Sequence, residues 1–305
     1  MVKRPVGAGP VGWFQGGRRP LVATQTLGVL LVVLAAASRA AGEEPPAASQ
    51  PEAPGIQDNS FLIEEAYNQD PGVVQHISSF VRSFDGDTWA YSFTQEWPLR
   101  GLTHQLSYTL LVAEAGAGNR GLGDLALNYR YQLLGNSEAR LACSPRLSML
   151  LPTGDASKGL GAGGFGLQVG VPFSLVLGKH LVSHANLGFT RVFSARDTVD
   201  DRASISTYSL GASLVWLASS RFNVLTETTW TRAQSVTGPD ERASADLWLV
   251  SPGIRWAYNF KSGLQIVPGL AFPLGVGPSH GEKSFLLYLS FEHPFGKHTH
   301  GGSTS

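Results

Sequence analysis

The chain has 305 residues, of which 43% are hydrophobic and only 15% are charged, and its 23 basic residues balance its 23 acidic residues. Soluble domains usually carry about 25% charged residues, so this protein has little charge for its size. A net charge of zero also argues against a nucleic-acid partner, because binding to phosphates requires a basic surplus. The composition does not exclude small neutral or amphipathic ligands.

The first 40 residues have the features of an export signal. Basic residues such as Lys3 and Arg4 precede the apolar run 27–37, and small residues follow at Ser38 and Ala40. These are the three parts of a signal peptide, so we expect cleavage after Ala40 or a residue or two later. A membrane anchor is the alternative, but the apolar run is well short of the ~20 residues that a spanning helix needs.

The next residues predict a linker and a lead into one domain. Residues 41–59 are rich in proline and lack periodicity, which is typical of a disordered linker. The stretch 61–71 mixes apolar and acidic residues and is either a short helix or a lead-in strand. We expect a barrel domain over 60–295 with a short periplasmic lead, and a flexible tail over 296–305. Cys143 is the only cysteine and lies among apolar residues, so we interpret it as a packed or lipid-facing side chain.

After this lead, apolar and polar residues alternate to the end of the chain. The stretch 121–134 shows the pattern clearly, because Leu127 and Tyr129 share one parity while Asn128 and Arg130 share the other. Such a period of two predicts strands with one apolar and one polar face. About twelve segments have this pattern, at approximately 73–82, 88–97, 104–113, 121–134, 138–151, 163–176, 180–193, 204–217, 221–232, 245–259, 263–272 and 284–295.

The connections between these segments alternate in length. Tight turns are expected at 98–102, 135–136, 177–179, 218–220 and 260–262. Long, polar, glycine-rich loops are expected at 83–87, 114–120, 152–162, 194–203, 233–244 and 273–283. Short turns at one end and long loops at the other are typical of bacterial outer-membrane barrels, whose turns face the periplasm.

Aromatic residues recur at an interval that fits a membrane. They form pairs whose two members lie eight positions apart in the sequence. Eight residues span about 26 Å along a strand and about 20 Å along the axis of a barrel whose strands tilt by ~40°. That height matches the apolar band of an outer-membrane barrel, so we predict two lipid-facing aromatic girdles. A soluble β-sandwich has similar strands, but the export signal, this interval and the long strands argue against it. The girdle residues are Trp89 and Trp97, Phe165 and Phe173, Tyr208 and Trp216, Phe222 and Trp230, and Trp248 and Trp256.

The opposite parity is polar or small, and its charged residues are candidates to line the lumen. Buried unpaired charge is costly, so these residues either form an ion-pair network that fills a narrow barrel or surround a constriction that guides a solute. Both interpretations stay open, and the mixture of signs argues against a strongly ion-selective pore. The candidates are Glu96, Asp124, Asn128, Arg130, Arg140, Arg146, Glu227, Arg255 and Glu292.

The sequence shows no motif for catalysis or for a cofactor. Acyl-transfer chemistry needs a serine and a histidine in contact with an orienting third group, and no nucleophile motif surrounds His76, His104 or His184. His298 and His300 form a pair in the tail but lack the further ligands that a metal site requires. We therefore predict no catalytic residue, no cofactor and no metal site.

Three stretches resemble the outer-membrane family named for the meta-pathway of phenol degradation. They are GLGDLALNYRYQLL at 121–134, LPTGDASKGLGAGG at 151–164 and FLLYLSFEHPF at 285–295. The similarity covers roughly 61–295, and it implies a channel for hydrophobic or aromatic small molecules. Barrels of this kind usually end at a phenylalanine that the barrel-assembly machinery recognises, whereas ten residues follow Phe295 here.

Together these observations predict a transmembrane up-and-down antiparallel β-barrel of about 12 strands in the bacterial outer membrane. Its expected partners are outer-membrane lipid, the barrel-assembly machinery and a small hydrophobic or aromatic solute that diffuses passively through the lumen. The alternatives are a lipid-modifying outer-membrane enzyme and a structural barrel with a plugged lumen.

Overall fold

The computed structural model describes Ile56 and residues 58–84, 86, 88–136 and 138–295. The expected signal peptide, most of the expected linker and the tail after Phe295 lie outside the described residues. Within the described part of the chain, no helix is both long and apolar enough to cross a membrane.

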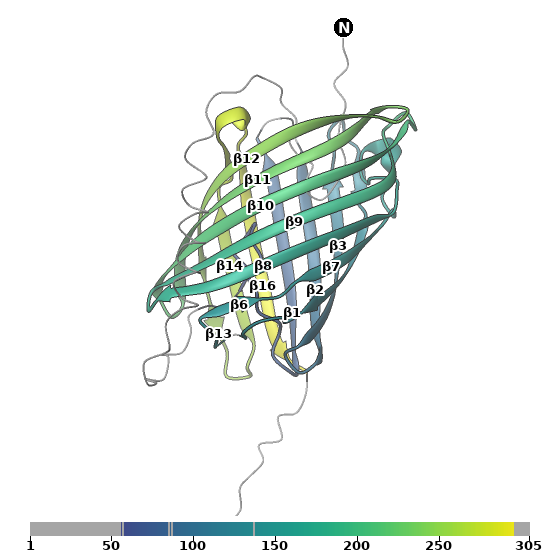
Figure 1. Ribbon diagram of the computed structural model, residues 1–305. Helices are drawn as coiled ribbons and strands as arrows, with labels where there is room; N and C mark the ends of the chain where they lie inside the picture. The colour runs from purple at the N-terminus through teal and green to yellow at the C-terminus, as the bar shows by residue number, and fades with distance from the viewer. Residues whose placement is uncertain (1–55, 57, 85, 87, 137, 296–305) are drawn as a thin grey trace, which may run out of the picture.

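The described chain forms a closed antiparallel barrel of twelve strands, as the sequence predicts (Figure 1). Four of these strands are each interrupted into two segments, so the strand labels run to sixteen. The segments are β1 (Val73–Ser83), β2 (Trp89–Arg100), β3 (His104–Glu114), β4 (Arg120–Leu122), β5 (Leu125–Tyr131), β6 (Leu141–Cys143), β7 (Arg146–Leu151), β8 (Gly166–Gly178), β9 (Leu181–Arg196), β10 (Arg202–Ser219), β11 (Phe222–Gly238), β12 (Glu241–Trp256), β13 (Tyr258–Asn259), β14 (Gln265–Ala271), β15 (Leu274–Gly275) and β16 (Ser284–Pro294). Two 3-10 turns, η1 (Ala156–Lys158) and η2 (Gly277–Ser279), lie in the long loops.

The first and last strands close the barrel. β1 pairs with β16 in an unbroken antiparallel register from Val73 opposite Pro294 to Ser83 opposite Ser284. Strands that are adjacent in sequence pair around the remaining wall, and β14 joins β12 to β16. Closure pairs the edges that an open sheet would expose, which is how a β-structure satisfies its backbone in lipid.

Two strand interruptions coincide with prolines. β6 and β7 are separated by Ser144 and Pro145, and β14 and β15 are separated by Phe272 and Pro273. Proline has no N–H to donate to the ladder, so regular pairing is interrupted there and continues in the next strand segment. Next to the second interruption, β12 pairs with β14 only from Gly253 to Arg255.

Two of the predicted long loops are shorter than the sequence predicts, because the strands on either side extend into them. β9 continues to Arg196 and β10 begins at Arg202, while β11 continues to Gly238 and β12 begins at Glu241. In these extensions Ala195, Ala203 and Val236 join one buried apolar cluster, while the remaining residues are mostly polar. The regular apolar alternation therefore ends in the sequence before the strands end in the structure. Figure 1 shows these tilted strands reaching the end that carries the long loops.

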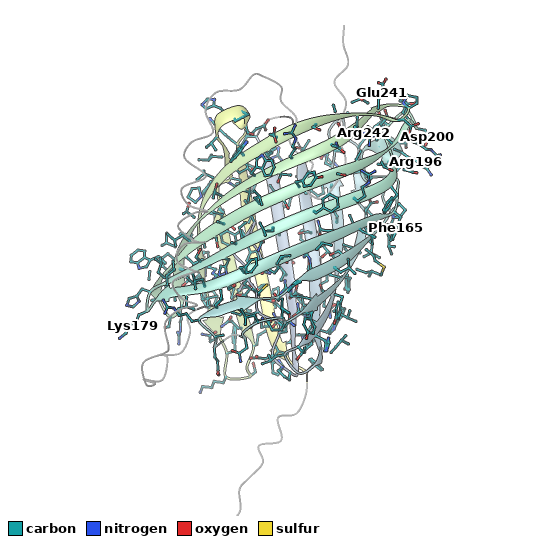
Figure 2. The ribbon with its side chains drawn as sticks, in the orientation of Figure 1. Phe165, Lys179, Arg196, Asp200, Glu241 and Arg242 are labelled. Carbon is teal, nitrogen blue, oxygen red and sulfur yellow. The ribbon has the colours of Figure 1, made fainter. Side chains whose placement is uncertain are left out.

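The aromatic residues predicted as girdles fall into two rows on the outer face. Trp230 lies opposite Trp248 near the long-loop end, and Phe222 lies opposite Trp256 near the tight-turn end. Trp216, toward the tight turns, is the most exposed of the ten, at 55%. Charged side chains gather beyond the rows, as Figure 2 shows for Arg196, Asp200, Glu241 and Arg242 at one end and Lys179 at the other. The contact of these rows with lipid stays a prediction.

Candidate functional site

The residues before β1 lie inside the barrel. Asp58 receives hydrogen bonds from Tyr288 (2.6 Å) and Ser290 (2.5 Å) on β16, and the N–H of Gln69 donates to Gln105 Oε1 on β3 (2.7 Å). We call residues 58–70 the plug. The sequence predicted a lead on the periplasmic side, formed by a helix or a strand; the structure instead shows an irregular segment across the lumen.

Arg255 holds the first residues of the plug, and Ile56 before it, through their backbone carbonyls. Its Nη1 donates to the carbonyl oxygens of Asp58 (2.5 Å) and Asn59 (2.6 Å), and its Nη2 donates to that of Ile56 (3.0 Å). The Arg255 side chain is only 1% exposed. These residues fall at the end of the expected disordered linker and the start of the expected lead, and here they are packed inside the barrel.

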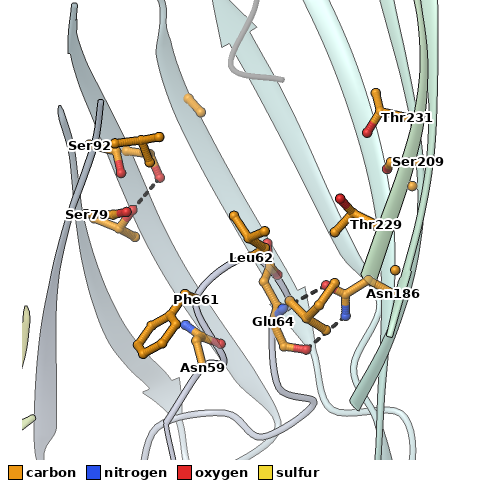
Figure 3. A pocket seen from close by; sticks show the side chains of 18 of the residues that line it. Asn59, Phe61, Leu62, Glu64, Ser79, Ser92, Asn186, Ser209, Thr229 and Thr231 are labelled. Carbon is orange, nitrogen blue, oxygen red and sulfur yellow. Dashed lines mark hydrogen bonds between the residues drawn. The ribbon is translucent and has the colours of Figure 1, made fainter. Parts of the chain in front are cut away.

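Glu227 and Asn186 hold the middle of the plug. Glu227 Oε1 accepts the N–H groups of Leu62 (2.7 Å) and Ile63 (3.1 Å). The Asn186 amide binds both backbone groups of Glu64, accepting its N–H (2.7 Å) and donating to its carbonyl (2.8 Å) (Figure 3). An irregular segment has no ladder of its own, so buried backbone groups must find partners on the wall.

The last part of the plug is held by Arg130, which lies on β5, and by Gln132, which follows that strand. Arg130 Nη1 donates to the carbonyl of Tyr67 (3.1 Å), and Gln132 Nε2 donates to that of Ala66 (2.8 Å). Gln132 Oε1 accepts the N–H of Asn68 (2.9 Å). The plug is therefore bound by side chains from strands all around the barrel.

Two acidic residues of the plug have opposite electrostatic environments. Burial favours the neutral form of Glu64, but Arg146, which forms a close ion pair with it, and Arg130 at 3.2 Å outweigh burial and hold its pKa below the ordinary value. Burial, followed by the nearby charge of Asp58, raises the pKa of Glu65 to about 8. Docking of the plug thus favours ionised Glu64 and protonated Glu65.

Glycines on the inner wall make room for the apolar side chains of the plug. A Cβ atom at Gly269 would lie 2.3 Å from the Phe61 ring, and one at Gly253 would lie 2.6 Å from it. A Cβ atom at Gly211 would lie 2.2 Å from Ile63 Cδ1. Any larger residue at these positions would displace the plug, so the wall and the plug are complementary in shape.

A cavity of about 480 Å³ lies between the plug and the long loops (Figure 3). Phe61, Leu62 and Ile63 of the plug form part of its lining, together with hydroxyl and aliphatic side chains of the wall. Charged residues also reach it, namely Glu64, Glu96, Asp124, Arg130 and Arg146. The wall residues include Ile77, Ser79, Val81, Ser92, Thr109, Leu111, Leu150, Ser209, Thr229, Leu249 and Leu286. This mixture suits a small apolar molecule that carries a hydroxyl or carbonyl group.

Asp124 fixes the loop beside the cavity. Its Oδ1 accepts the N–H of Gly154 (3.0 Å) and its Oδ2 accepts that of Ala162 (2.7 Å). Thr153 Oγ1 adds two bonds, since it accepts from the N–H of Leu125 (2.9 Å) and donates to the carbonyl of Gly123 (3.0 Å). The Gly-Leu-Gly-Asp and Leu-Pro-Thr-Gly-Asp motifs therefore bind each other and set the shape of this rim.

The structure separates the nine predicted lumen residues into three groups. Arg130, Arg146, Glu227 and Arg255 contact the plug, and Glu292 reaches it through Gln75, whose Nε2 donates to both Glu292 and Asp58 (3.0 Å each). Glu96, Asp124 and Asn128 also line the interior, together with Arg130 and Arg146 at the cavity. Arg140 was predicted wrongly. It lies in a bend before β6, is exposed, and its Nε donates to the carbonyl of Val176 at 3.4 Å.

The sequence prediction missed the uncharged members of this set. Asn186, Gln105, Gln132 and Ser174 all bind plug backbone, Ser174 through the N–H of Ala66 (2.8 Å). Asn186, Gln105 and Ser174 lie on the inward parity of their strands, so parity could have found them. Only charged residues and one asparagine were singled out, because an unpaired charge is the costlier group to bury.

The fold defines the class of this protein as a closed antiparallel β-barrel that resembles those of bacterial outer-membrane proteins. The sequence profile of one family, described as "Putative MetA-pathway of phenol degradation", matches residues 66–277. The chain belongs to this family, as the motifs at 121–134 and 151–164 indicate.

A solved structure of an outer-membrane channel shares the fold. An outer membrane channel from Pseudomonas putida F1 has a TM-score of 0.55 and 15% identity, and the match covers 75% of this chain and 97% of that one. The NanC porin is less similar, with a TM-score of 0.48 and 11% identity over 71% of this chain and 98% of that one, and this weaker likeness supports no conclusion about the present chain. A comparison with curated protein sequences gives no significant match.

Proposed function

We propose that the protein is a channel of the bacterial outer membrane that passes small hydrophobic or aromatic solutes by passive diffusion through the barrel. The observation that carries this proposal is the cavity of about 480 Å³ above the plug, because its wall combines aliphatic side chains with hydroxyl groups. Charged side chains also reach the cavity, but Glu64, Arg130 and Arg146 are paired with one another and Asp124 binds loop backbone, so they leave the aliphatic wall to contact a solute. The family and the channel fold support the same role.

The plug determines how a solute would pass. Phe61, Leu62 and Ile63 form the apolar floor of the cavity, and the charged groups beneath them bind the plug. A solute therefore enters the cavity from the long-loop end, and movement of the plug opens the way toward the tight-turn end. If the tight turns face the periplasm, as the sequence predicts, this direction is inward. Protease cleavage of sites engineered into the two kinds of connection on intact cells tests that orientation.

Uptake of a neutral aromatic probe by cells that carry or lack the protein tests the transport proposal. The variant Leu111→Gln places an amide group in the aliphatic part of the cavity, and we expect it to reduce uptake because a buried amide without a partner is costly next to an apolar solute. Ser79→Ala is the matched control, since it removes a hydroxyl group from the same cavity and adds no polar group. Uptake that is independent of the protein, or equal in both variants, would contradict the proposal.

A structural barrel with a plugged lumen is the second candidate, and the dense hydrogen bonding of the plug favours it. The two candidates differ in transport, because a purely structural barrel would give no uptake even when the plug is destabilised. Lipid hydrolysis receives less support. Ser174 Oγ lies 2.7 Å from His184 Nδ1, but both are buried and Ser174 Oγ is already occupied by the N–H of Ala66. Neither residue lines the cavity.

A further inference from the structure

Two histidines face each other on the outer surface of the barrel, at the seam between its first and last strands. His76 lies on β1 and His293 on β16, and their Nε2 atoms are 3.1 Å apart. Their rings are stacked with centroids 5.2 Å apart and an interplanar angle of 23°. The pair is separate from the plug and the cavity.

The strand register places both rings on the outer face near the tight-turn end. Gln75 and Glu292, which precede them in sequence, point inward and bind each other. Val74 is opposite His293, and Gln75 is opposite Glu96, so His293 lies about level with Trp97 of the predicted girdle. At this level of an outer-membrane barrel, polar groups meet lipid headgroups and water.

The separation of the two nitrogens fits a shared metal ion. With metal–nitrogen bonds of about 2.0–2.1 Å, two imidazoles on one ion lie about 2.9 Å apart at a right angle and about 3.4 Å apart in a tetrahedron. The observed 3.1 Å falls between these values. His293 Nδ1 faces the carbonyl oxygen of Pro294 at 3.5 Å, and an N–H there leaves the lone pair on Nε2, as is usual for a ligating histidine.

We propose that His76 and His293 bind a divalent transition-metal ion of the Cu²⁺, Ni²⁺ or Zn²⁺ class, and that the ion links the closing strands of the barrel. In the metal-free protein one ring must donate Nε2–H to the other. Metal binding replaces this bond, and the donor ring moves its proton to Nδ1, so that no proton is released. Among the described residues no third histidine, cysteine, aspartate or glutamate joins the pair. What distinguishes this pair from two histidines in a tail is that paired strands hold its nitrogens 3.1 Å apart, so that water can complete the coordination of an ion already held by both rings.

Electron paramagnetic resonance with Cu²⁺ tests the site on the full mature protein, purified in detergent without a polyhistidine tag. We expect one bound Cu²⁺ with the signature of two imidazole nitrogens. His76→Phe and His293→Phe keep a ring beside Phe93, which stacks on His76 at 6.0 Å, and each should abolish that signature. His104→Phe is the matched control, because His104 is another histidine near the tight turns but its Nδ1 is bonded to Tyr129 Oη at 2.7 Å.

The tail supplies the competing explanation, because His298 and His300 follow in the sequence. A protein that lacks residues 296–305 should keep the two-nitrogen signature. Loss of the signature on removal of the tail would overturn the proposal. Persistence of the signature after replacement of both His76 and His293 would overturn it as well. Cu²⁺ should also raise the unfolding temperature of the wild-type barrel but not that of either phenylalanine variant. An equal rise in all three proteins would exclude the link between the strands.

Discussion

The two halves of the barrel interior differ in the side chains that the wall directs inward and in what those side chains bind. In the half near the tight turns, long polar side chains such as Arg130, Glu227 and Arg255 point inward and bind plug backbone. In the half near the long loops, short hydroxyl and aliphatic side chains such as Thr229 and Leu249 surround the cavity. Inward charge in this protein therefore binds the plug from below, and Glu64, Glu96, Arg130 and Arg146 lie where the plug and the cavity meet.

This difference follows from what each half must satisfy. The plug has no regular structure, so its buried N–H and C=O groups need donors and acceptors from the wall, and long side chains reach them. A cavity for an apolar solute must avoid such groups, because an unmatched polar group there opposes binding. The predictions below test whether the halves are as independent as this comparison implies.

The largest effect is expected for Arg255→Ala in the plug-filled half. It removes three donors from the carbonyls of Ile56, Asp58 and Asn59 and leaves buried acceptors unpaired. Loss of one partner of a buried charged contact typically costs about 3–5 kcal/mol, so the docked plug should be destabilised by that order. Single-channel recordings should show more frequent and larger openings than in the wild type. Arg140→Ala, an exposed arginine outside the lumen, should leave the recordings unchanged.

A smaller effect is expected from filling the space that glycine leaves for the plug. Gly269→Val places side-chain atoms where the Phe61 ring lies, and overpacking of this kind costs about 1–3 kcal/mol. Channel openings should increase, and the second change Phe61→Ala should reverse part of the effect because it vacates the same space. Gly178→Val is the control, since a Cβ there would meet no atom within 4 Å. Equal effects at both glycines would show that the fit to Phe61 is unimportant.

The strands and their faces could be predicted because each follows from local alternation. Leu127 is 37% exposed and Asn128 is 5% exposed, which is the two-faced pattern that the sequence indicates. The extensions near 194–203 and 233–244 were missed because the prediction used apolar alternation, which ends where the strand leaves the apolar layer.

The plug could not be predicted because its structure depends on contacts distant in sequence. Leu62 binds Glu227, 165 positions away, and Asp58 binds Ser290, 232 positions away. Local pattern carries no information on such pairs, and an irregular segment has no periodicity of its own. The inward charges were visible in the sequence, but what they bind was not.

The pH dependence of plug docking gives a third test. Burial raises the pKa of Glu65 to about 8 from a usual value near 4.5, so docking binds a proton. The contribution of Glu65 is then fully present below about pH 4.5 and is lost as the pH rises through 8. Channel openings should therefore increase between pH 6 and pH 9. Glu65→Gln should flatten this dependence, because a neutral amide replaces the protonated acid, and an unchanged pH profile in this variant would contradict the assignment.

The smallest effect is expected in the cavity, where Thr229→Val replaces a hydroxyl group by a methyl group of nearly the same volume. Thr229 lines the cavity, and the hydrogen bonds that hold the plug come from other residues such as Glu227, Asn186 and Arg255 (Figure 3). Single-channel openings should therefore match those of the wild type, while uptake of an apolar aromatic probe should rise slightly because the wall becomes more apolar. If the two halves are coupled, openings will change together with uptake, and the plug and the cavity will have to be treated as one site. If they are independent, only uptake will change, because solute selection resides in the long-loop half and closure in the other.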